Sequence, residues 1–99
     1  MKASRPHDET VVKLLKDDPD FAAVYLGAAL DEADQPGGQA GLLAALRHIA
    51  EAQGMASVAE RAGIPREIVY RALSPRGSPT MKMLLALLNA TGLRLRVQA

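Results

Sequence analysis

Side chains suited to contacting a nucleic acid follow Gly63. Arg66, Tyr70 and Arg71 recur there at helical spacing. At about 100° per residue, the polar side chains of residues 66–74 share an arc of roughly 140°, and aliphatic side chains fill the opposite side. Arginine suits phosphates and guanine edges, and a tyrosine ring suits thymine methyl groups. The pattern predicts a helix that reads double-stranded DNA, although an ordinary solvated helix shows the same amphipathicity.

Individual contacts can be assigned from these residue types. We expect Arg66 and Tyr70 to contact base edges and Arg71 to contact a base or a phosphate. Glu67 suits a cytosine amine, but its position four residues before Arg71 favours an intrahelical ion pair. Ser57, near the start of the preceding helix, is expected to hold a phosphate with backbone N–H groups. The remaining candidates for DNA contact, at the helix end and in the following loop, are Ser74, Arg76 and Ser78.

Two short helices joined by a glycine turn, over about residues 55–74, must position these side chains. Ala59 is the small residue needed where the helices cross, and Gly63, four residues later, tolerates the positive φ of a turn. Pro65 suits the first position of the second helix, where no N–H is needed. Arg61 is expected to be a surface charge. The structural positions of this helix-turn-helix are Val58, Ala59, Ala62, Gly63, Ile64, Val69 and Ala72.

The rest of the chain also predicts helices. Ninety-nine residues support one domain, and a core with one Phe, two Tyr and no Trp must use aliphatic residues, which favours helices over a β-sandwich. Periodicity and capping signals predict helices over about 8–16, 18–34, 39–53, 56–62, 65–73 and 80–90. Residues 1–7 are expected to be a flexible tail, and the alternation in 93–97 predicts a short strand. The predicted fold is an all-α bundle of five to six helices over 8–99, with a terminal helix and strand over about 80–97.

Charge divides the chain into two unlike halves. Residues 1–53 contain five Lys/Arg and nine Asp/Glu, whereas residues 54–99 contain seven Lys/Arg and two Asp/Glu. A basic half suits an anionic polymer, and an acidic half suits a different partner, although an uneven solvated surface gives the same count.

Several other functions lack their residues. The chain has no Cys, and its two His, in the expected tail and off the main apolar stripe of a helix, do not have metal-ligand spacing. No nucleophile elbow, phosphate loop or calcium loop is present. We therefore expect no enzyme activity, no cofactor and no metal. No apolar run is long enough to span a bilayer and no signal-peptide core is present, so we expect a cytoplasmic protein with no membrane partner.

Four segments carry a resemblance to a known family. They are LLKDDPDFAAVYLGAAL, LLAALRHIAEAQGM, AERAGIPREIVYRALSPRGSP and LLALLNATGLRL. Together they resemble the antidote (antitoxin) proteins of HigA-type addiction modules, a helix-turn-helix family related to the phage Cro/CI repressors. The resemblance implies a RelE/ParE-like toxin that the protein neutralises, operator DNA that is palindromic, repression of the shared operon as a homodimer, and a bacterial cytoplasm. The sequence departs from the family pattern at Ala56 and Pro65, where Ser or Thr is usual.

The C-terminal region has the composition of an interface. An apolar stripe along the last helix and the alternate residues of the expected strand need partners. A second copy of the chain, the edge of the toxin's sheet, or the chain's own core would each cover them. The residues expected at a dimer interface are Met81, Leu84, Leu85, Leu88, Leu93, Leu95 and Val97.

The acidic N-terminal half, with Asp17, Asp18 and Asp20, is expected to face the toxin. Two alternatives keep the same fold: a stand-alone prophage-type repressor without a toxin, and an interaction protein whose helix-turn-helix no longer binds DNA.

Overall fold

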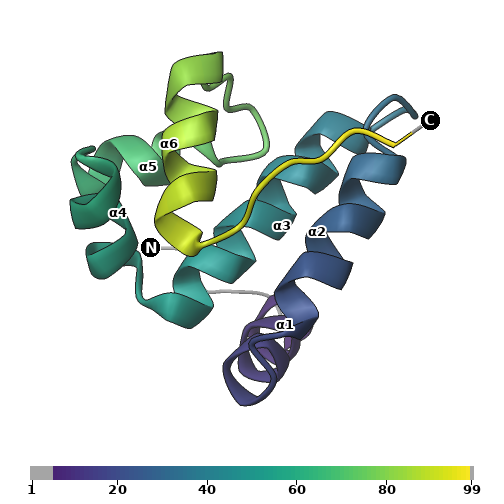
Figure 1. The fold of residues 1–99 in the computed structure, drawn as a ribbon, viewed down its shortest axis with the longest axis horizontal. Coiled ribbons are helices and arrows are strands. Elements are labelled where there is room, and N and C mark those ends of the chain that lie inside the picture. The colour runs from purple at the N-terminus through teal and green to yellow at the C-terminus, as the bar shows by residue number, and fades with distance from the viewer. Residues whose placement is uncertain (1–5, 99) are drawn as a thin grey trace.

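The computed structural model describes residues 6–98, which form a bundle of six α-helices (Figure 1). The all-α prediction is confirmed. No helix in this part of the chain is both long and apolar enough to cross a membrane. The helices are α1 (Pro6–Asp17), α2 (Phe21–Asp31), α3 (Gly38–Gln53), α4 (Met55–Ala62), α5 (Arg66–Ala72) and α6 (Met81–Thr91).

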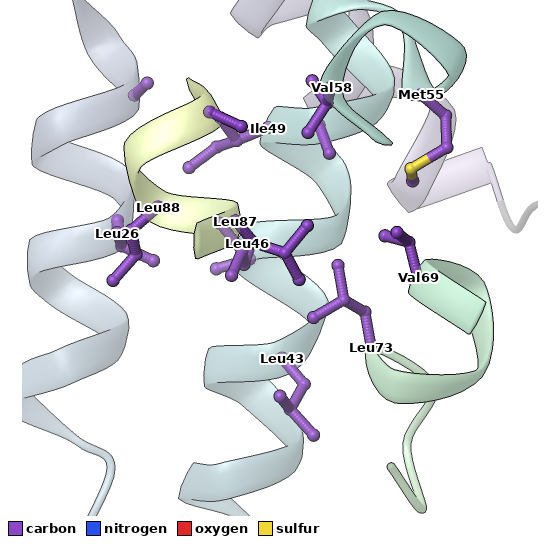
Figure 2. Close-up of a cluster of buried hydrophobic side chains, with 14 of the residues drawn as sticks. Leu26, Leu43, Leu46, Ile49, Met55, Val58, Val69, Leu73, Leu87 and Leu88 are labelled. Carbon is purple, nitrogen blue, oxygen red and sulfur yellow. The ribbon is translucent and has the colours of Figure 1, made fainter. Parts of the chain in front are cut away.

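Helix α3 lies at the centre and contacts the helices on both sides. α1 and α2 pack on one side of it, while α4 and α6 pack on the other, and α5 is attached through α4 (Figure 1). A single core takes buried side chains from all six helices. Leu46 and Ile49 of α3 lie at its middle, with Leu26, Val58 and Leu87 around them (Figure 2). This core fixes α4 and α5, the pair expected to contact DNA, to the rest of the molecule.

Helices α1 and α2 differ from their predicted bounds. α1 begins at Pro6, two residues early, and residues 1–5 of the expected tail lie outside the described part. α2 begins at Phe21, because the N–H groups of Phe21 and Ala22 bond the carbonyls of Asp18 and Pro19 in a tight turn. It ends at Asp31, three residues early, where the following turns bond over three residues instead of four.

The predicted strand over 93–97 is wrong, because no strand forms within residues 6–98. The N–H of Leu93 bonds the carbonyl of Leu88 and closes α6, and the chain then continues without regular structure. A strand needs a second extended backbone beside it, and every regular element within residues 6–98 is a helix, which offers no extended edge to pair with. The alternating pattern therefore remains unpaired within one chain.

A buried histidine joins the three N-terminal helices. His48 of α3 is only 3% exposed. Its Nδ1 lies 2.8 Å from the Tyr25 hydroxyl of α2, and its Nε2 lies 2.9 Å from Oδ1 of Asp8 in α1. Burial raises the pKa of Tyr25, so its O–H remains a donor to Nδ1. A neutral imidazole that carries its proton on Nε2 satisfies both contacts.

We expect the protein to lose stability as pH falls below 6.5. Burial lowers the pKa of His48 from the ordinary 6.5, with help from Arg47, although the charges of Asp8 and Glu51 and the Asp8 hydrogen bond oppose it. The unfolded chain then binds the proton more readily than the folded chain. The contribution of neutral His48 to the free energy of unfolding is therefore complete above pH 6.5 and is lost as the pH falls below it. Urea unfolding at about pH 7.5 and 5.5 measures the difference. The variant His48→Gln should reduce the difference in unfolding free energy between the two pH values, and His7→Gln should retain it. An equal difference in both variants would show that His48 is not the group responsible.

Candidate nucleic-acid interface

Helices α4 and α5 are joined by a turn in which Gly63 has φ 72° and ψ 30°. The Gly63 N–H bonds the carbonyl of Glu60, and the Ile64 N–H bonds the carbonyl of Ala59. This pair of bonds is a Schellman motif, which requires the left-handed conformation that glycine adopts without strain. Pro65 directly precedes α5, one position before the first helical residue where the sequence placed it. The predicted pair of short helices with a glycine turn is therefore present.

Helix α5 separates its polar and apolar side chains as predicted. Val69 and Leu73 are completely buried and point toward the core (Figure 2), and Ala72 is 9% exposed. On the other side, Arg66, Glu67, Tyr70 and Arg71 are all exposed. The described part of the chain therefore leaves this face of α5 open to a large partner.

The loop after α5 extends the exposed face. Arg76 and Ser78 are exposed, and with Arg71 they line a groove of about 440 Å³ between α5 and the start of α6. Thr80 caps α6 by accepting a hydrogen bond of 3.1 Å from the Met83 N–H. The structure thus brings together four of the predicted DNA-contacting residues, because Ser74 lines the same groove as Arg71, Arg76 and Ser78.

Tyr70 belongs to the exposed face of α5 but borders a different hollow from Arg71. It is 42% exposed and lines a separate hollow of about 530 Å³ together with residues of α1, Glu51 and Met55. Glu67 and Arg71, both within the described part, do not form the ion pair that their spacing predicts. Within residues 6–98, Lys13 and Asp17 form an ion pair at 3.0 Å, whereas the contact of the neutral His48 with Asp8 is a hydrogen bond.

Two of the predicted serines already hydrogen-bond within the chain. The Ser74 hydroxyl donates to the carbonyl of Arg71 at 2.9 Å, so Ser74 closes α5, and its donor is not free for a phosphate. The Ser57 hydroxyl accepts from Nη1 of Arg61 at 2.5 Å and keeps its own O–H as a donor. The Ser57 hydroxyl therefore keeps a donor for the predicted phosphate contact, whereas the donor of Ser74 is already in use within the chain.

Two arginines that the sequence left without a role hold helix ends in place. Arg47 of α3 donates from Nη1 to the Leu73 carbonyl at 2.6 Å and so fixes the end of α5. Arg61 is not a free surface charge, because its Nε donates to the Ala90 carbonyl at 2.9 Å and links α4 to the end of α6. Cations near helix C-termini are favourable, because carbonyls there lack partners. No local signal identifies these contacts, since their partners lie 26 and 29 residues away.

The comparison with known families decides the identity. The profile of a family described as "Probable addiction module antidote protein" matches residues 10–99. The chain belongs to this family. Over 57 residues, 58% of the chain, it is also 42% identical to an uncharacterized protein of Haemophilus influenzae, and this match spans 59% of that protein's length. No solved structure matches the chain.

In this family member, the residues expected at a dimer interface divide into two groups. Met81 and Leu85 form an exposed apolar pair on α6, 67% and 48% exposed. Leu88, only 4% exposed, belongs to the chain's own core and is not available to a second copy, and Leu84 is half-buried against that core. Leu93 also packs against the core, whereas Leu95 and Val97 are 46% and 99% exposed.

Proposed function

We propose that this antidote neutralises a RelE/ParE-like toxin and represses its own operon by binding operator DNA through α5. One observation carries the DNA-binding part: Arg66 and Arg71 are exposed on a helix whose opposite side is anchored in the core. A Cro/CI-type helix-turn-helix places its second helix in the major groove in this way, with the first helix across the backbone.

Charge and loop geometry support the same proposal. Residues 54–99 carry a net charge of +5, and α4, α5 and the following loop all lie in this half. Arg76 and Ser78 border the groove beside α5, which supports a role for them in holding phosphates while Arg66 reaches base edges. This function involves no catalysis, cofactor or metal.

A second copy is part of the proposal. Repressors of this type bind two half-sites one helical turn apart, which requires a dimer with a twofold axis. The exposed pair Met81 and Leu85 on α6 is the surface that we assign to this contact, together with Leu95 and Val97 of the C-terminal segment. Family membership favours an antidote with a toxin over the alternative of a stand-alone repressor.

DNA binding is tested with the promoter fragment upstream of the gene and a random fragment of equal length, titrated with salt. We expect the affinity for both fragments to fall steeply as salt rises. Arg76→Ala should weaken binding to both fragments alike and reduce the salt slope by about 1. Arg66→Ala should lower the preference for the promoter by about 1–3 kcal/mol.

The matched control is Arg96→Ala, because residue 96 is exposed in a C-terminal segment that runs toward the end of α2, away from α4 and α5 (Figure 1). It removes the same charge and should leave the promoter preference unchanged. Equal binding to the two fragments by the native chain would refute the repressor function.

A further inference from the structure

Helix α2 is apolar on every side but is covered on only one. Residues 21–30 contain no charged side chain. Ala22 and Leu26 are buried against α3, which is the main contact of this helix. On the outer side Val24 is 65% exposed, and Ala23 and Ala28 are also exposed. A helix that is hydrophobic all round is normally buried, so the outer face of α2 lacks a partner in the single chain.

Carboxylates lie at both ends of this outer face. All are exposed, and they are Asp17, Asp18 and Asp20 before α2, and Asp31, Glu32 and Asp34 at its end and in the turn that follows. The sequence has no Lys or Arg between Lys16 and Arg47. Lys13 pairs with Asp17 at 3.0 Å, and within residues 6–98 the other five carboxylates form no ion pair. The outer face is therefore an apolar strip with an acidic border.

The border selects the class of partner. DNA and anionic membranes would be repelled by these carboxylates. A second copy packed through α2 would bring the two acidic borders together, because an isologous contact pairs the same patch with itself. A basic protein surface with an apolar ridge fits both the strip and its border.

We propose that the outer face of α2 binds a groove of the toxin, with Val24 and Ala28 inserted and the acidic border against lysines and arginines of the toxin. The small side chains at 23, 27 and 28 allow the toxin to approach the helix backbone closely. The inference rests on the proposed toxin neutralisation and names the surface that performs it. It also separates the two functions, because α2 and α5 lie on opposite sides of α3 (Figure 1).

The experiment uses the full chain and the product of the adjoining toxin-like reading frame, with Kd measured by calorimetry. Ala28→Arg places a bulky cation on the strip and should weaken toxin binding at least about tenfold. Joint replacement of Asp18, Asp20 and Asp31 by Asn should weaken it and reduce its salt dependence. Asn89→Arg adds the same charge at an exposed position of α6 and should leave toxin binding unchanged.

The readouts separate the possible results. Ala28→Arg should keep native unfolding and native DNA binding, which excludes a folding defect. If the native chain binds the toxin and both α2 variants bind it equally well, the surface assignment is overturned while toxin neutralisation stands. If the native chain does not bind the toxin, both the proposed toxin neutralisation and the assignment of its surface are refuted. If Ala28→Arg instead changes the size of the free protein in solution, a second copy covers α2 and the proposal is wrong.

Discussion

Replacing Gly77 by alanine is expected to lower the free energy of unfolding by about 2–4 kcal/mol. Gly77 does not have a positive φ, so the cost arises from space. A Cβ at this position would overlap the carbonyl oxygen and carbon of Ala72, which are backbone atoms that cannot turn aside. The loop must therefore move away from the end of α5, or α5 must shift.

The same change should weaken DNA binding beyond its effect on stability. The loop carries Arg76 and Ser78, and the Gly77 N–H closes it by bonding the carbonyl of Ser74 at 2.8 Å. A displaced loop would move both proposed phosphate ligands, so affinity for promoter and random DNA should fall together. Urea unfolding and the salt-titrated binding assay measure the two effects.

Gly41→Ala is the matched control, because a Cβ there meets nothing within 4 Å. Gly41 lies inside α3, and alanine should stabilise the helix by about 0.5–1 kcal/mol. Glycine-to-alanine substitution is thus expected to lower the free energy of unfolding at Gly77 and to raise it at Gly41, and this contrast tests the packing of the loop. A neutral or stabilising Gly77→Ala would show that the loop does not pack against α5 in this way.

Local periodicity was sufficient to predict the helices and the exposed face of α5. Helix α5 buries a stripe whose spacing is visible in the sequence, and the residues opposite Val69 and Ala72 had to face outward. The turn was predictable for the same reason, since the conformation at Gly63 depends on a few adjacent residues. The sequence alone was therefore enough to identify Arg66 and Arg71 as candidates for DNA contact.

Contacts between distant segments were not predictable. Arg47 and Arg61 look like ordinary exposed cations, and their roles depend on which helix end packs beside them. His48 appeared to lie off the apolar stripe, yet Asp8 and Tyr25 arrive from two other helices and satisfy it inside the core. The strand over 93–97 failed because alternation shows only that a strand can form, while pairing requires a neighbour.

Replacing Leu73 by alanine is expected to cost about 2–5 kcal/mol, the range for removing a buried leucine. Leu73 is completely buried at the end of α5, where its side chain enters the core (Figure 2) and its carbonyl accepts from Arg47. Helix α5 has seven residues, too few to be stable without tertiary contacts. Its position thus depends on Val69, Leu73 and the Arg47 hydrogen bond.

The loss of stability caused by Leu73→Ala should therefore be concentrated in α5. We expect hydrogen exchange of the α5 amides to accelerate more than that of the α3 amides, and DNA affinity to fall while toxin binding through α2 is retained. Leu14→Ala is the control, because Leu14 is 45% exposed and its truncation should change stability by less than about 1 kcal/mol. If Leu73→Ala cost no more than Leu14→Ala, or loosened α3 as much as α5, the core would not be what positions α5. The presentation of Arg66 and Arg71 to DNA would then require another explanation.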